Sequence, residues 1–214
     1  ARELGGSVAF VETVFSPFGV ARRTLRSRMR ELWFSRPDLF KSFLESITET
    51  LRDYVAAVAG TGASGIFYSV NGLSTDEVSD AEFEQWVLPF DMAVLEAVWE
   101  QVRQGRFFFV VAHLHGLNLR YSLAFARYAC HAFNWSDRLT PPTLAEARRL
   151  TRKALMGGIR ETNLSQRTPS EVAREVRSAV EQAGRAGLFV APGCAVDTQV
   201  PSDLIHAARE ACRQ

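Results

Sequence analysis

Two histidines and a cysteine are the residues of this chain whose types and spacing could bind a metal. His113 and His115 close the most apolar run of the sequence, FFFVVAHLH, and only four histidines occur among the 214 residues. Alternate residues of a strand share a face, so the two imidazoles point the same way, with about 6–7 Å between their Cα atoms. Cys194 follows a glycine at the end of the last predicted strand. Two imidazoles and one thiolate with an open fourth position suit a catalytic zinc ion.

Each of these residues also has a structural interpretation. A His-x-His pair alone is a weak metal signal, and a single buried cysteine usually packs as a small apolar residue. The other two histidines, His131 at a strand start and His206 within a helix, are predicted to be structural. Asn71 and Asp137 follow predicted strands, where either a pocket role or a turn and capping role fits them.

Six apolar runs separated by helical patterns would position these residues. The runs are nearly continuous rather than alternating, as in strands of a parallel sheet that helices cover on both sides. Capping boxes mark several of the intervening helices, with a glutamate three residues after Ser or Thr. These boxes begin at Ser79, Thr143 and Thr168, and further helices are predicted over 39–54 and from about Ser202. The predicted strands cover 8–15, 65–70, 107–115, 130–136, 154–159 and 188–194.

Repeated strand–helix alternation indicates an α/β protein, either a doubly wound sheet or a (β/α)8 TIM barrel. A wound sheet would be favoured by a glycine-rich phosphate loop after the first strand, and VFSPFGV is not one. Polar residues at strand ends favour the C-terminal rim of a barrel. A closed barrel has eight βα units, so residues 1–214 are predicted to be one barrel domain holding its C-terminal six units. Two N-terminal units are expected to be missing, and the first and last visible strands are not expected to pair.

The composition narrows the classes of partner. The net charge is +1 and the arginines are dispersed, which gives no long-range attraction for nucleic acid. There is no run of eighteen apolar residues for a membrane span and no pattern of a signal peptide. The chain has three cysteines, a small and odd number that argues against a secreted disulfide framework. The cysteine content therefore predicts a cytoplasmic protein. The composition is compatible with a homo-oligomer.

Three segments resemble the uroporphyrinogen decarboxylase superfamily. They are FLESITETLRDYVAAVAGTGASGIFYSV, FEQWVLPFDMAVLEAV and GCAVDTQVPSDLIHAAREA, and the likeness runs over nearly the whole chain. The resemblance implies a (β/α)8 barrel with its active site at the C-terminal rim, in proteins that are longer at the N-terminus. Ser69 matches a serine that the decarboxylases place near the carboxylates of their substrate.

The superfamily holds two chemistries, and the sequence departs from both. Decarboxylases use no metal and bind a tetrapyrrole with an arginine-rich N-terminal loop that is not found here. Their tyrosine after SPF is replaced, with Arg23 near its place, and their histidine in the last-strand turn is replaced by Cys194. The second chemistry is that of proteins that look like zinc-dependent methylcorrinoid methyltransferases. Their zinc ligands lie in a His-x-Cys pattern and in a Gly-Cys turn. The chain matches these at His113 and Cys194 and departs at His115, where they have cysteine.

The resemblance to the methyltransferases implies that a zinc ion is held by His113, His115 and Cys194. A corrinoid carried by a partner protein would supply the methyl group, and a small thiol substrate would accept it. A histidine in place of an anionic cysteine would make a zinc-bound thiolate a poorer nucleophile. The predicted substrate-binding residues are Ser69, Asn71 and Asp137.

Three other functions stay open from the sequence. One is cofactor-free decarboxylation of a tetrapyrrole-like ligand. The second is an inactive fragment, or a subunit that another chain completes. The third is metal-dependent hydrolysis, although in amidohydrolase barrels the His-x-His pair follows the first strand, whereas here it comes late.

Overall fold

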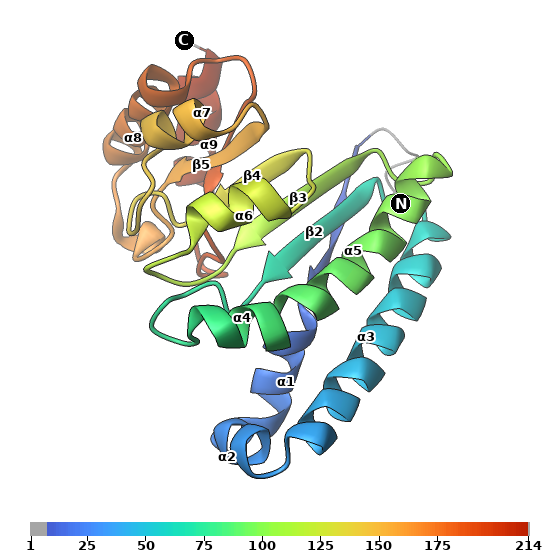
Figure 1. Cartoon of the computed structure of the whole chain (residues 1–214). Coiled ribbons are helices and arrows are strands. Elements are labelled where there is room, and N and C mark those ends of the chain that lie inside the picture. The colour runs from blue at the N-terminus through green and yellow to red at the C-terminus, as the bar shows by residue number, and fades with distance from the viewer. Residues whose placement is uncertain (1–7, 214) are drawn as a thin grey trace.

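Six parallel strands alternate with helices in the computed structural model, which describes residues 8–213 (Figure 1). The strands are β1 (Val11–Phe15), β2 (Gly65–Val70), β3 (Phe109–Leu114), β4 (Ala132–Trp135), β5 (Ala154–Ile159) and β6 (Leu188–Pro192). The helices are α1 (Pro17–Leu25), α2 (Arg28–Ser35), α3 (Pro37–Ala59), α4 (Asp80–Trp86), α5 (Leu88–Arg103), α6 (Tyr121–Arg127), α7 (Leu144–Leu150), α8 (Pro169–Ala183) and α9 (Ser202–Arg213). A short 3-10 helix spans Leu164–Gln166.

The strands form one sheet in chain order from β1 to β6, and each neighbouring pair is parallel. Within residues 8–213 the first and last strands lie at opposite ends of this sheet and do not pair. The α/β architecture of an open, partial TIM barrel is therefore confirmed. Three strand ends were predicted too far along the chain. β3 ends at Leu114, β4 at Trp135 and β6 at Pro192, so His115 and Cys194 lie just beyond their strands.

Side-chain alternation divides the sheet into a helix-covered face and an inner face. Ile66, Tyr68 and Val70 of β2 are completely buried in the main core, beneath helices such as α3 and α5, which pack side by side (Figure 1). The residues between them in β2 point to the opposite, inner face. On this inner face the ring centroids of Phe189 of β6 and Phe109 of β3 lie 5.3 Å apart. Phe189 is nevertheless 45% exposed. The inner face is thus the accessible one.

Local signals in the sequence account for the helix ends. The three predicted capping boxes form, with each Ser or Thr and its glutamate bonded in both directions. The helix predicted over 39–54 is longer, because Pro37 supplies a favoured first helical position. Tyr54 of this helix is 43% exposed and donates a hydrogen bond to Glu12. Between residues 8 and 213 there is no helix whose length and apolar character would let it cross a membrane.

A buried carboxyl group links the covering helices to the sheet. Asp91 of α5 accepts hydrogen bonds from the hydroxyls of Tyr68, at 2.8 Å, and Tyr128, at 2.6 Å. Burial raises the pKa of Asp91 to about 7, although both hydrogen bonds act in the opposite direction. Tyr68 lies on β2 and Tyr128 follows α6, so the three side chains hold α5 against two parts of the fold.

Replacing Tyr128 with Phe is expected to lower the free energy of unfolding by about 1–3 kcal/mol, because one oxygen of the buried Asp91 carboxyl loses its donor. Urea unfolding followed by circular dichroism measures the change. The matched control is Tyr121→Phe, at a half-buried ring outside this network. Equal effects of the two substitutions would contradict the role given to Asp91.

The stability of the protein should also depend on the protonation of Asp91. Its pKa is higher in the folded chain, at about 7, than in an unfolded chain, at about 3.9. The folded state therefore holds the proton more tightly, and this stabilising contribution is lost as the pH rises from about 4 through 7. Asp91→Asn cannot ionise, so its stability relative to the wild type should increase between pH 5 and pH 8. Parallel urea titrations at several pH values test this, and a constant difference would refute it.

Candidate metal centre

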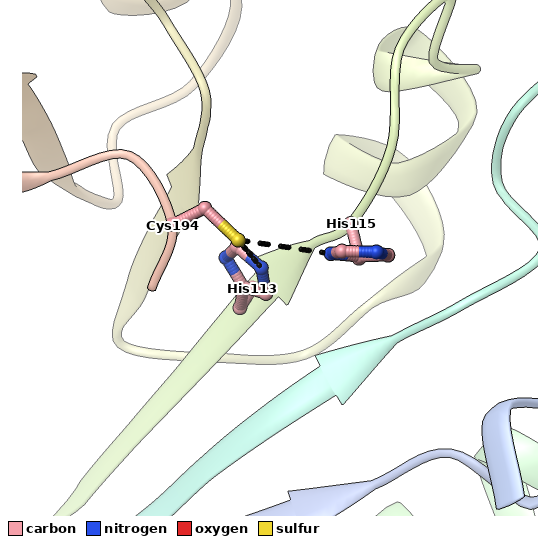
Figure 2. A group of neighbouring side chains, drawn as sticks. All are labelled: His113, His115 and Cys194. Carbon is pink, nitrogen blue, oxygen red and sulfur yellow. Dashed lines mark hydrogen bonds between the residues drawn. The ribbon is translucent and has the colours of Figure 1, made fainter. Parts of the chain in front are cut away.

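His113, His115 and Cys194 meet at the carboxyl edge of the sheet (Figure 2). The Sγ atom of Cys194 lies 3.6 Å from Nε2 of His113 and 3.8 Å from Nδ1 of His115. All three potential ligand atoms lie within 4.8 Å of one another. Bonds of 2.0–2.3 Å to a tetrahedral zinc ion place ligand atoms roughly 3.3–3.8 Å apart. The predicted proximity of the three side chains is confirmed, and the donor set fits such an ion with one position open.

The ring of His113 is fixed by Asn134 on the neighbouring strand β4. The amide nitrogen of Asn134 donates to the carbonyl oxygens of Met156, at 2.9 Å, and Pro192, at 3.1 Å. Its Oδ1 atom must therefore accept, and it lies 2.6 Å from Nδ1 of His113. The proton of the imidazole is thereby held on Nδ1, and the lone pair of Nε2 points to Cys194. Metal-binding histidines are generally oriented by such a second hydrogen bond.

His115 continues the hydrogen-bonding pattern of β3 although it lies outside the strand. Its backbone N–H donates to the carbonyl of Val70 at 3.0 Å, which keeps its side chain on the same face as that of His113. Gly116 follows with a φ of 115°, a conformation that favours glycine, and turns the chain away from the sheet. The strand and this turn together direct both imidazoles to one point.

The turn that carries Cys194 requires a glycine at position 193, because neighbouring atoms leave no space for a side chain. A Cβ atom on Gly193 would lie 2.6 Å from the Cα of Ser136 and 2.7 Å from the carbonyl oxygen of Trp135. Gly193 also donates from its backbone N–H to the carbonyl of Ile159 at 3.2 Å. The close approach of two backbones at this turn therefore excludes any side chain at position 193.

The site favours uncharged side chains before a metal binds. Burial lowers the pKa of His113 to about 4, and burial together with the charge of Arg22 lowers that of His115. Both imidazoles are therefore neutral near pH 7, the form that binds metals. Burial raises the pKa of the Cys194 thiol, so this group must release a proton when it becomes a metal ligand.

A cavity of about 440 Å³ opens beside the three side chains, on the inner face of the sheet. Ser69 contributes to its wall, whereas the other two predicted substrate-binding residues, Asn71 and Asp137, do not. Phe67 stacks on the ring of His113 with 5.3 Å between the centroids. The complete wall consists of Thr13, Phe15, Arg23, Phe67, Ser69, His113, His115, Asn134, Met156, Ala191, Pro192, Cys194 and Ala195.

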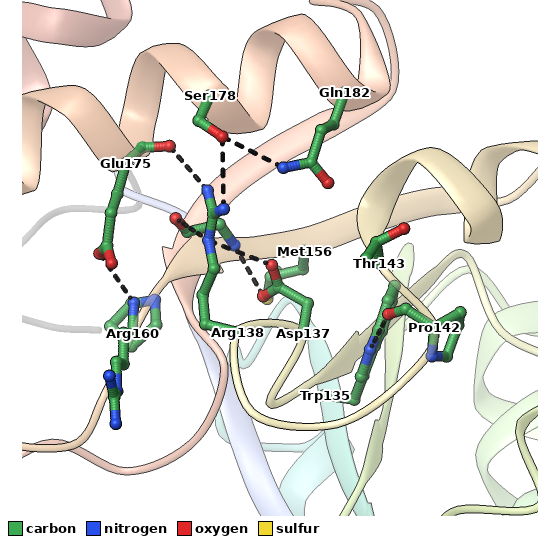
Figure 3. Close-up of polar contacts among 12 residues, drawn as sticks. Trp135, Asp137, Arg138, Pro142, Thr143, Met156, Arg160, Glu175, Ser178 and Gln182 are labelled. Carbon is green, nitrogen blue, oxygen red and sulfur yellow. Dashed lines mark hydrogen bonds and ion pairs between the residues drawn. The ribbon is translucent and has the colours of Figure 1, made fainter.

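Asn71 and Asp137 have structural partners. The side chain of Asn71 donates to the carbonyl of Ser69 at 3.1 Å, in the turn after β2. Asp137 accepts from the backbone N–H of Gly158 at 2.9 Å, and Arg138 donates to the carbonyl of the same residue (Figure 3). These contacts stabilise a kink in β5, where Gly158 has a φ of 99°. Both residues thus support the rim through the turn and capping role that the sequence left open.

Sequence reasoning did not identify Asn134, which orients the ring of His113, or the place of Arg23 in the cavity wall. Asn134 lies in register with His113 on the next strand, so the period of two within the run 130–136 would have placed it on the inner face. Arg23 was noted only as a replacement for a tyrosine, and it lines the cavity. The remaining histidines lie outside the site. His131 accepts a hydrogen bond from the backbone of Val110, and His206 is exposed on α9.

An open sheet of parallel βα units with polar side chains at its carboxyl edge defines this protein as part of a (β/α)8 barrel. The chain belongs to the uroporphyrinogen decarboxylase (URO-D) family, whose model matches residues 1–214. A search of curated proteins finds no match.

Solved structures with the same fold include a methyltransferase and a candidate methionine synthase. A methyltransferase from Methanosarcina mazei superimposes with a TM-score of 0.82 and 19% identity, over 99% of this chain and 60% of that one. A candidate vitamin-B12 independent methionine synthase from Listeria monocytogenes gives a TM-score of 0.58 and 14% identity, over 100% of this chain and 65% of that one. The chain thus spans less than two thirds of both proteins, and at these identities the likeness concerns the fold.

Gly193→Ala is expected to weaken zinc binding by about 10-fold or more, because the added Cβ would displace the Cys194 turn from Trp135 and Ser136. Competition with a chromophoric chelator measures the affinity. Gly60→Ala is the matched control, since its Cβ would meet nothing closer than 3.4 Å. An unchanged zinc affinity in a folded Gly193→Ala protein would show that the position of this turn does not matter.

Proposed function

We propose that this chain carries the zinc site of a methyltransferase that moves a methyl group from a corrinoid on a partner protein to a small thiol. The observation that carries the proposal is the convergence of His113, His115 and Cys194, with ligand atoms within 4.8 Å, beside a cavity. Membership of the URO-D family and the fold shared with the methyltransferase from Methanosarcina mazei support it.

The three side chains would hold the metal in distinct ways. His113 would offer Nε2, because Asn134 keeps the proton on Nδ1. His115 would offer Nδ1, the ring atom that faces Cys194, and Cys194 would bind through Sγ after losing its proton. Zinc bound in such a site lowers the pKa of a thiol and presents the thiolate to an electrophilic methyl group.

The cavity would determine how the thiol approaches. Apolar side chains, among them Phe15, Phe67 and Met156, form much of its wall and limit the water near the sulfur. Because a thiolate is more reactive with less hydration, such a wall would favour attack on a methyl group. A methyl donor on a separate protein would reach the sulfur from the open inner face.

The histidine at position 115 would tune this reactivity. A neutral imidazole in place of a thiolate leaves one ligand anion, that of Cys194, around the metal. The more positive centre would bind a thiolate more tightly and lower the pKa of its thiol further, at the expense of nucleophilicity. We expect this chain to methylate its substrate more slowly than a site with two cysteines, and at a lower pH.

Decarboxylation of a tetrapyrrole is the second candidate. The observation that favours it is Ser69, which lines the cavity and matches, by resemblance, a serine that the decarboxylases place near substrate carboxylates. Incubation with uroporphyrinogen, followed by chromatography of the porphyrins after oxidation, separates the two functions. Products with fewer carboxylates would support decarboxylation.

Cys194→Ser should abolish both zinc binding and thiol methylation, because a serine hydroxyl is a poor zinc ligand at neutral pH. Bound zinc is expected to fall from about one per chain to near zero. Metal analysis after dialysis, and methyl transfer from free methylcobalamin to a thiol, measure the two properties. Cys212→Ser, at an exposed position of α9, is the control and should retain both. Retention of zinc and activity by Cys194→Ser would refute the assignment.

A further inference from the structure

A second cavity, of about 410 Å³, lies on the helix-covered side of the last strand. Strands β5 and β6, helices α8 and α9 and the segments that join them form its wall, at the end of the sheet where α8 packs against α9 (Figure 1). Val190 of β6 faces this cavity, whereas the next residue, Ala191, faces the cavity beside the metal centre. The two cavities therefore lie on opposite faces of one strand, and the proposed methyl transfer uses only the inner one.

The wall of the second cavity is almost entirely aliphatic. Ten of its twelve residues are aliphatic, and the buried ones among them, such as Val172 and Leu204, belong to a small hydrophobic core separate from the main core. Protein interiors contain few voids larger than a water molecule, so a hollow of this size is more than a packing defect. Two of the wall residues remain accessible, since Ile205 is 60% and Val196 is 38% exposed. Accessible apolar surface gathered around a hollow is typical of a binding site.

Arg209 of α9 is the one charged residue in this wall. Its side chain is exposed, and within residues 8–213 it makes no ion pair. The adjacent carboxylate, that of Glu210, is paired with Arg213 at 2.8 Å. Among the described residues that form the wall, none is acidic. The guanidinium at the border of the cavity is therefore available to an anion.

The apolar wall and the single cation together define the chemistry of a ligand. Such a wall buries a hydrocarbon chain, and each buried methylene adds to the affinity. An exposed guanidinium adds a smaller, salt-sensitive attraction for a negative group at the end of that chain. The volume lies in the lower part of the range for ligand sites, which favours a chain of moderate length.

We propose that the cavity between β6, α8 and α9 binds a medium-chain aliphatic carboxylate. The hydrocarbon chain lies among the aliphatic wall residues, and the carboxylate pairs with Arg209. The inference goes beyond the proposed function and is independent of it, because the ligand contacts neither the metal-binding side chains nor the cavity beside them.

Calorimetric titration of the full chain with hexanoate, octanoate and octan-1-ol tests both parts of the ligand. Octanoate is expected to bind at one site per chain, roughly 10-fold more tightly than hexanoate, because two more methylenes are buried. It should bind about five-fold more tightly than octan-1-ol at low ionic strength, and this preference should shrink as salt is added.

Two pairs of variants locate the site, with circular dichroism to verify that each protein is folded. Ala208→Phe places a ring in the cavity and should weaken octanoate binding by about 10-fold or more. Ala207→Phe is the matched control, at a half-buried neighbour outside the wall, and should leave the affinity unchanged. Arg209→Met should remove the preference for octanoate over octan-1-ol. Arg174→Met, at an exposed arginine of α8 outside the wall, should retain it.

The contrary outcomes are equally specific. If the folded wild type does not bind octanoate, the inference is overturned, and further polypeptide becomes the better occupant of this cavity. Binding that survives Ala208→Phe, or that is lost equally in Ala207→Phe, shows that octanoate binds elsewhere and also overturns it. A preference for octanoate that persists in Arg209→Met, or that disappears equally in Arg174→Met, overturns the pairing of the carboxylate with Arg209. None of these results alters the proposed function, which zinc analysis and the methylation assay test separately.

Discussion

The hydrogen bonds of the Asn134 side chain are the interaction on which the candidate metal centre depends. Through one amide, β4 is joined to His113 of β3, to the carbonyl of Met156 in β5 and to that of Pro192 at the end of β6. The same contacts therefore fix the histidine ring and the start of the turn that bears Cys194. Both N–H groups of the amide donate, and its oxygen accepts one hydrogen bond, so that one lone pair of the oxygen is left over. The fold therefore determines the orientation of the amide.

The edge of the sheet around this amide is built from buried polar groups, most of which have hydrogen-bond partners, although Oε2 of Glu161 has none within residues 8–213. Asp137 and Arg138 bind the peptide groups of the kinked Gly158, and Ser136 donates to Glu161. Buried polar groups are stable only when they are hydrogen-bonded, so this edge is rigid where its partners are complete. A rigid rim suits a metal site, since ligands held in place before binding lose little freedom when the metal arrives.

Membership of the URO-D family fixes the architecture, and the chemistry has to be read from the site. This family supplies the barrel, and the related solved structures share its fold at 19% and 14% identity. The particular features of this chain lie at two positions of one cavity. A histidine stands at 115 and an arginine at 23, and both line the cavity beside Cys194. Such side chains have to carry the argument about chemistry, because one fold accommodates several chemistries.

The sequence by itself determined the parallel α/β class, the six strands, the capping boxes and the shared face of His113 and His115. These follow from periods of two and 3.6 residues and from caps that act within a few residues. Only the tertiary structure decided that Cys194 reaches histidines 81 and 79 residues away, and that Asn134 orients one of them. It also decided that Asn71 and Asp137 serve the rim while Arg23 enters the cavity. A polar residue at a strand end looks the same in sequence whether it faces a ligand or a neighbouring peptide group, because packing between distant segments chooses its partner.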